Sequence, residues 1–155
     1  MNIARMTTVL SLALLGFGFS IRAEDGKPQC KSVSGTIAAT LTGETSVMGT
    51  VRGDLQGAVT ANVVRATPQP DGRVSLDLTH VFLTDARDTL ITEDQAVWTP
   101  VAGRKGVFQM STTYSITGGS GKYEGASGTM ENHGEVDLGR KQITLGYSGQ
   151  VCPGK

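Results

Sequence analysis

The chain has 155 residues, with 14 Lys or Arg and 14 Asp or Glu, so its formal net charge is zero. No basic stripe or polybasic segment is present, which excludes proteins that bind nucleic acid or anionic lipid through charge. A chain of this length is sufficient for one domain with a real core.

Residues 1–23 have the features of a secretory signal peptide. Arg5 provides a basic start, residues 7–19 form an apolar run, and residues 21–23 form an acceptable cleavage site. The apolar run is shorter than the roughly 20 residues that span a membrane. We therefore expect export to the periplasm or the extracellular space, with one mature domain from residue 24 to residue 155.

The two cysteines, Cys30 and Cys152, lie near the two ends of this domain. In the oxidising compartment that export implies, a disulfide between them is the default expectation. The alternative is two unpaired thiols. A bridge would make the first and last strands neighbours, as they are in a closed barrel.

Apolar and polar residues alternate along the mature chain, which is typical of half-buried β-strands. The alternating segments are 33–41, 51–63, 74–82, 90–98, 108–116, 128–138 and 143–151. Gly57 marks either a bulge or a break that divides the second segment into two strands. Turn signals separate the later segments, notably Pro-Gln-Pro-Asp-Gly at 68–72 and Gly-Arg-Lys-Gly at 103–106.

No segment shows a sustained helical period, so the sequence predicts an all-β domain of seven or eight antiparallel strands. A small closed barrel is favoured because one face of each strand is apolar and the cysteines would join its ends. A two-sheet β-sandwich is the alternative.

Between the fifth and sixth alternating segments lies the glycine-rich stretch Gly-Gly-Ser-Gly-Lys-Tyr-Glu-Gly-Ala-Ser-Gly, residues 118–128. It lacks the first glycine of a phosphate-binding P-loop, because position 116 is Ile116. We predict a tight corner between two strands, anchored by its one large side chain. The residues expected to shape this corner are Gly118, Gly119, Gly121, Tyr123 and Gly125.

This stretch resembles the corner of the barrel family that includes plant allene oxide cyclases and dirigent proteins. The resemblance implies a small antiparallel barrel, with an apolar cavity in the cyclases and a substrate-positioning pocket in the dirigent proteins. It also implies association as trimers. The close match is confined to the corner, so no catalytic residue of the family is carried over to this chain.

Several polar residues share the apolar faces of their strands and should therefore point into the barrel. A buried charge or imidazole without a partner costs several kcal/mol, so we expect these residues to pair with one another. The predicted polar cluster in the lumen comprises His80, Asp94, Tyr114 and Asn132, with Thr92 and Thr112 on the same faces.

A hairpin around residues 85–88 would bring two of these residues together. A three-residue loop over residues 86–88 would place His80 directly opposite Asp94, and Leu76 opposite Trp98. A carboxylate beside a histidine orients the ring and stabilises its protonated form, the arrangement of a general acid or base. Tyr114 could donate a hydrogen bond to a substrate oxygen.

Three functional hypotheses follow. The leading one is an exported barrel that binds a small apolar or aromatic molecule in its lumen, lined by Trp98, Phe82, Phe108 and Met110. The second is a cofactor-free isomerase or cyclase, and the third is a structural or interaction module with a filled core. A lumen too tight for a small ligand would favour the third.

No metal or cofactor is expected. His133 lies among Glu131, Glu135 and Asp137, but these residues are on the outer face, where a solvated acidic strand is the simpler interpretation. A thiolate zinc site is excluded if both cysteines form the disulfide.

Overall fold

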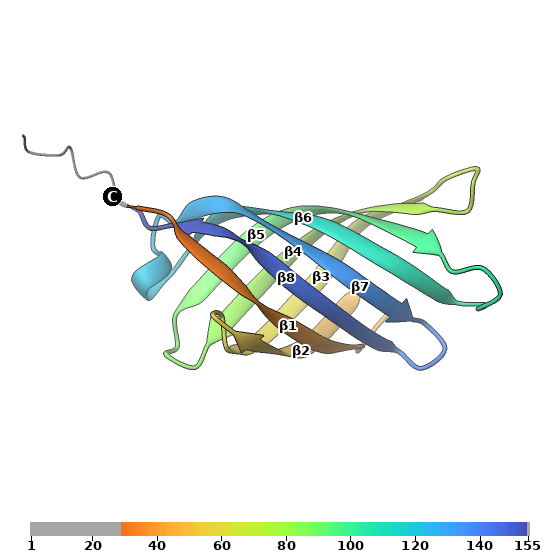
Figure 1. Cartoon of the computed structure of the whole chain (residues 1–155), viewed down its shortest axis with the longest axis horizontal. Coiled ribbons are helices and arrows are strands. Elements are labelled where there is room, and N and C mark those ends of the chain that lie inside the picture. Colours follow the sequence, from red (N-terminus) through yellow and green to blue (C-terminus); the bar gives the residue numbers. More distant parts are fainter. Residues whose placement is uncertain (1–28, 155) are drawn as a thin grey trace, which may run out of the picture.

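The computed structural model describes residues 29–154 and shows eight β-strands in one closed antiparallel barrel (Figure 1). The predicted signal peptide lies outside the described residues. The elements are β1 Lys31–Leu41, β2 Ser46–Gly53, β3 Gly57–Pro68, β4 Val74–Thr84, β5 Thr89–Pro100, β6 Val107–Gly119, the 3-10 helix η1 Gly121–Tyr123, β7 Ser127–Asp137 and β8 Gln142–Cys152. No helix within residues 29–154 is long and apolar enough to cross a membrane.

The barrel closes between the first and last strands. β1 pairs with β8 from Lys31–Val151 to Thr40–Gln142, and the disulfide between Cys30 and Cys152 joins the two strands where this ladder begins. The predicted barrel and disulfide are therefore confirmed, and the sandwich alternative is wrong. In the chain-entropy model, a bridge across 122 residues of sequence stabilises the fold by about 4–5 kcal/mol.

Alternation decides which side chains fill the barrel. Along β6, buried residues alternate with exposed ones, as the pleat of a strand requires. Gly149 of β8 allows the backbone of β7 to approach closely, because a Cβ there would lie 2.4 Å from the Cα of Met130. The largest fully buried side chains are Tyr114, Phe82, Leu55, Leu90, Met130, Val51 and Val136.

The second alternating segment is two strands, as one of the two interpretations of Gly57 proposed. Its first strand, β2, begins at Ser46, five residues before the predicted start. Residues 46–50 do not show the usual alternation of apolar and polar residues. Met48 is apolar but 56% exposed, and Gly49 faces the lumen without a side chain. Leu55, in the turn between β2 and β3, is fully buried, and its N–H donates to the Tyr147 hydroxyl at 3.0 Å.

The 3-10 helix η1 of the glycine-rich stretch and the C-terminal end of β8 lie at the same end of the barrel, on the left in Figure 1. The disulfide is at this end too, because Cys152 is the last residue of β8. Tyr123 is buried in the core, at 7% exposure. Gly121 has a φ of 61°, a left-handed conformation that an L-residue with a Cβ adopts at a steric cost. Gly119 has no such φ, but a Cβ there would lie 1.9 Å from the carbonyl oxygen of Thr89. The end of the barrel that carries η1 and the disulfide is called the closed end.

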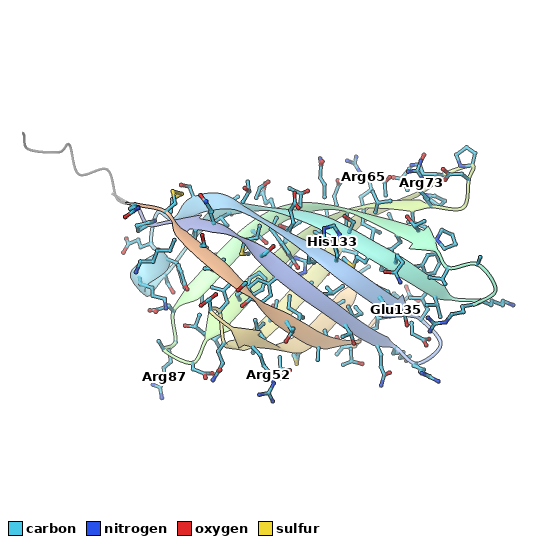
Figure 2. All side chains as sticks on the ribbon, viewed as in Figure 1. Arg52, Arg65, Arg73, Arg87, His133 and Glu135 are labelled. Carbon is cyan, nitrogen blue, oxygen red and sulfur yellow. A yellow bond between two sulfur atoms is a disulfide. The ribbon has the colours of Figure 1, made fainter. Side chains whose placement is uncertain are left out.

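The opposite end carries the turns after β1, β3, β5 and β7 and is called the open end (Figure 1). One side of it is extended: the ladder of β3 with β2 stops at Asn62, whereas its ladder with β4 continues to Pro68. Figure 2 shows the side chains of Arg52 and Arg87 directed away from the barrel, and Arg87 lies in the turn between β4 and β5 at the closed end. The rim of the open end is therefore uneven, with β3 and β4 paired beyond the point where β2 stops.

Candidate functional site

The polar centre of the lumen is a contact between His80 and Asp94. The Nδ1 atom of His80 lies 2.6 Å from Oδ2 of Asp94, and their side chains are 8% and 0% exposed. The hydroxyl of Thr92 donates a second hydrogen bond to the same carboxylate oxygen at 3.0 Å. An ionised carboxylate only accepts hydrogen bonds, so the proton in the first contact belongs to Nδ1 of the imidazole.

The register that produces this contact differs from the predicted one. His80 lies opposite Thr92, Asp94 opposite Leu78, and Trp98 opposite Val74 rather than Leu76. The hairpin has the expected three-residue loop, but the loop is residues 85–87, one residue earlier than predicted.

The physical reason is the backbone conformation of Arg87. Its N–H donates a hydrogen bond to the carbonyl of Thr84 and closes the turn, and its φ of 67° is in the left-handed region. Moving the loop by one residue shifts the pairing by two residues, and such a shift leaves every side chain on the same face. His80 and Asp94 therefore meet as diagonal neighbours.

Two aromatic rings fix the orientation of the imidazole. Tyr114 packs against it edge-on with ring centroids 5.0 Å apart, and Phe82 stacks on it at 6.0 Å. The Tyr114 hydroxyl accepts a hydrogen bond from the Asn132 amide. Burial raises the pKa of Tyr114, and the nearby Asp94 charge raises it further, although the bond from Asn132 opposes the shift. Tyr114 therefore remains a neutral phenol beside the imidazole.

Four buried polar atoms in the lumen have no hydrogen-bond partner within the described part of the chain. They are Asp94 Oδ1, Trp98 Nε1, Thr112 Oγ1 and Asn132 Oδ1. Each unsatisfied group of this kind costs about 1–3 kcal/mol. The structure thus brings together the four residues of the predicted polar cluster and the two threonines expected on the same faces. Thr92 donates to Asp94, whereas the Thr112 hydroxyl has no partner within the described residues.

One narrow cavity leads from the open end into this region. It has a volume of about 40 Å³, and its lining includes Glu44 and Trp98 at the rim, Met110 on the wall, and His80 and Tyr114 at its floor. That volume holds about three water molecules and is far below the roughly 300–1,000 Å³ of typical small-molecule pockets. The lumen proper is nearly filled by its own side chains.

The four residues predicted to line a ligand lie at different depths. Phe82 is fully buried in the core and Met110 is also buried, whereas Trp98 and Phe108 are half-buried at the open end with ring centroids 5.5 Å apart. Trp98, predicted to line the lumen, is only half-buried. A ring of partly buried apolar side chains surrounds the mouth: Ala39, Leu41, Val47, Val63, Val74 and Trp98.

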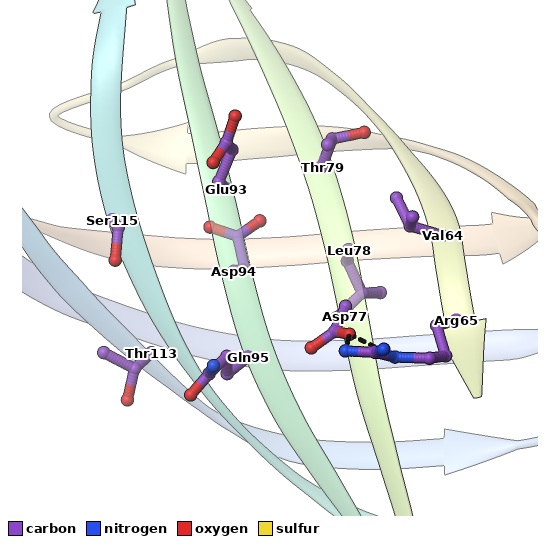
Figure 3. Close-up of a pocket in the computed structure, with 10 residues that line it drawn as sticks. All are labelled: Val64, Arg65, Asp77, Leu78, Thr79, Glu93, Asp94, Gln95, Thr113 and Ser115. Atoms are coloured by element: carbon purple, nitrogen blue, oxygen red, sulfur yellow. Dashed lines mark hydrogen bonds and ion pairs between the residues drawn. The ribbon is translucent and has the colours of Figure 1, made fainter. Parts of the chain in front are cut away.

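Two further features lie on the outer surface of the barrel. A wider depression, about 640 Å³, is open and lies on the outer faces of β3 to β6 (Figure 3). Its most prominent contact is an ion pair in which Arg65 Nε lies 2.7 Å from Asp77 Oδ2. On β7, the exposed side chains of His133 and Glu131 approach each other, with Nε2 of His133 4.0 Å from Oε2 of Glu131. Within residues 29–154, no three His, Cys, Asp or Glu residues are grouped so as to hold a metal ion.

Sequence reasoning identified the interior residues but not all of their partners. It missed the hydrogen bond from Thr92 to Asp94, although the spacing of two residues on one strand face indicates that these side chains are neighbours. It also missed Glu44, which is in a turn and reaches the rim of the cavity only through the tertiary fold.

No protein-family model matches the sequence, and no curated protein is similar to it. Among solved structures, the chain is similar to a pterocarpan synthase dirigent protein, with 15% identity over 98% of this chain and 100% of that chain. The TM-score is 0.36. At this identity and TM-score, the similarity establishes neither family membership nor function, and the barrel is established by the strand ladders themselves.

Proposed function

We propose that this protein binds a small apolar or aromatic molecule at the open end of its barrel. The observation that carries the proposal is the apolar cavity between Trp98 and His80, at whose rim the indole N–H is buried without a partner. The partly buried ring of apolar side chains around the mouth would gain stability by contact with an apolar ligand, at about 0.8 kcal/mol per methylene group buried.

The narrow cavity restricts how such a ligand would bind. Only a thin part could enter beside His80, and a wider part would rest at the mouth on Trp98 and Phe108. This differs from the predicted ligand enclosed within the lumen, for which the volume of about 40 Å³ is too small. Binding at the mouth also places the ligand beside the only tryptophan of the sequence.

That tryptophan provides the test. N-phenyl-1-naphthylamine is a neutral fluorophore that accepts excitation energy from indole, so binding should give saturable energy transfer from Trp98. Leu41→Asp, at the mouth, should weaken binding at least tenfold. Leu83→Asp places the same charge on the outer face, where Leu83 is 45% exposed, and should leave binding unchanged. Equal effects of the two substitutions, or no energy transfer, would reject the proposal.

The second candidate is a structural or interaction module, which the nearly filled lumen favours. It predicts that the barrel binds no apolar probe, so the same titration separates the two functions. The isomerase hypothesis is supported by the contact of His80 with Asp94 at 2.6 Å, but it requires a substrate carbon beside the imidazole. The cavity there admits groups of about the size of water.

The disulfide supports export, because such bonds persist in oxidising compartments. Trimeric assembly remains a prediction drawn from the family resemblance.

A further inference from the structure

We propose that the ligand is an unbranched apolar chain ending in a hydroxyl group, and that this hydroxyl donates a hydrogen bond to Nε2 of His80. This inference rests on the proposed function and specifies the chemical class of its ligand. Three properties of the cavity carry it: the hydrogen-bonding state of the imidazole, the charge of the lining and the shape of the space.

The first property is set by Asp94. Its carboxylate accepts the proton of Nδ1, so Nε2 is the imidazole nitrogen left for a ligand in the cavity that His80 lines. In the serine protease triad, an aspartate behind Nδ1 likewise presents Nε2 to the hydroxyl of serine, from which it accepts a proton. Packing against Tyr114 and Phe82 holds the ring in place. The floor of the cavity therefore presents an acceptor to an O–H donor.

The second property is the sign of the charge. Asp94 lies directly behind His80, and Glu44 stands at the rim. The cavity lining contains no Lys or Arg that could bind an anionic head group. A carboxylate entering this space would lose its hydration without gaining a cationic partner, which is unfavourable in an apolar lumen. The site should therefore select a neutral alcohol over the fatty acid of the same length.

The third property is shape. The cavity as a whole admits a few water-sized groups, which matches a hydroxyl and the first methylenes behind it but excludes a ring. Trp98 at the mouth and His80 at the floor line the same cavity. The cavity thus combines an apolar mouth with a small polar floor, and a thin chain whose hydroxyl end enters while the rest lies at the mouth fits this combination.

Three probes of nearly equal size separate these properties. 1-Octanol donates a hydrogen bond, 1-methoxyheptane is its neutral isomer without a donor, and octanoate carries a negative charge. Each would compete with N-phenyl-1-naphthylamine on the full mature protein with its disulfide intact. We expect 1-octanol to bind about tenfold more tightly than either of the others, the effect of one hydrogen bond to a buried partner.

Asp94→Asn tests the positioning role of the carboxylate. It removes the charge behind His80 at nearly constant shape, so the preference for 1-octanol over octanoate should fall to about threefold or less. Glu93→Gln is the matched control, because it neutralises the neighbouring carboxylate on the exposed face of β5. It should leave the preference at about tenfold. The ¹⁵N resonances of His80 should also show the Nδ1–H tautomer in the unsubstituted protein. This tautomer reports the contact with Asp94 directly, whereas a change in packing alone would not alter it.

The ranking of the three probes in the unsubstituted protein decides the inference even if Asp94→Asn fails to fold. Equal affinity for 1-octanol and 1-methoxyheptane would show that no donor is recognised, and tightest binding of octanoate would show that the floor is itself a donor. Either result overturns the inference while leaving ligand binding intact. Failure of N-phenyl-1-naphthylamine and all three probes to bind overturns the proposed function as well.

Discussion

Replacing Gly119 with alanine should lower the free energy of unfolding by about 2–4 kcal/mol, although its φ is not in the left-handed region. The new Cβ would lie 1.9 Å from the carbonyl oxygen of Thr89, which is backbone and cannot rotate away. Overpacking of this kind typically costs about 1–3 kcal/mol. The same carbonyl accepts the N–H of Ser120 at 2.9 Å, and losing that bond adds about 1 kcal/mol.

Two matched substitutions separate the steric effect from other causes. Gly121→Ala should cost about 1–2 kcal/mol, because Gly121 has a left-handed φ but its new Cβ would meet the Asp88 side chain, which can rotate, rather than backbone. Gly43→Ala should change stability by no more than about 0.5 kcal/mol, since its nearest contact is 3.7 Å away.

Urea unfolding with the disulfide intact measures all three. For a slope of about 1.5 kcal/mol/M, a loss of 3 kcal/mol moves the midpoint by about 2 M. A Gly119→Ala midpoint equal to that of Gly43→Ala would refute the steric argument for the closed end.

Three further predictions concern the disulfide, the buried phenol and the imidazole. Thiol counting on denatured, non-reduced protein should find no free thiol, and two titratable thiols per chain would show that the bridge is absent. Replacing both Cys30 and Cys152 with serine should lower the free energy of unfolding by about 4–5 kcal/mol. Because burial raises the pKa of Tyr114 above its ordinary value of 10.0, the folded state keeps a proton that the unfolded state releases above about pH 10. Stability should therefore be unaffected by this group below pH 10 and fall above it by up to about 1.4 kcal/mol per pH unit, and Tyr114→Phe should reduce that slope; equal slopes in alkaline urea titrations would contradict the assignment. Asp94→Ala should abolish the preference of His80 for the Nδ1–H tautomer, which ¹⁵N NMR measures directly, and an unchanged tautomer would mean that the carboxylate does not orient the ring.

Much of the fold could be predicted because the barrel repeats one simple pattern. From β4 to β8, the period of two places apolar residues on one face, and the terminal cysteines indicate that the chain ends meet. The meeting of His80 and Asp94 followed from parity alone. It tolerated a wrong hairpin register because a shift of two residues preserves the face on which each side chain lies.

What could not be predicted depends on local backbone conformation and on packing. The loop position was set by Arg87 in a left-handed conformation, which non-glycine residues seldom adopt and which no turn motif in the sequence indicates. β2 was shortened in the prediction because Met48 faces outward and Gly49 inward. The size of the cavity depends on how side chains from all eight strands fill the barrel, and alternation carries no information about that volume.

The most direct test of binding at the open end is the indole N–H resonance of Trp98 during a titration with N-phenyl-1-naphthylamine. The sequence contains one tryptophan, so the ¹H–¹⁵N spectrum has one such signal. Binding at the mouth should shift it saturably, while the amide of Leu83 on the outer face keeps its position. An indole signal that stays fixed up to millimolar ligand would contradict the proposed function.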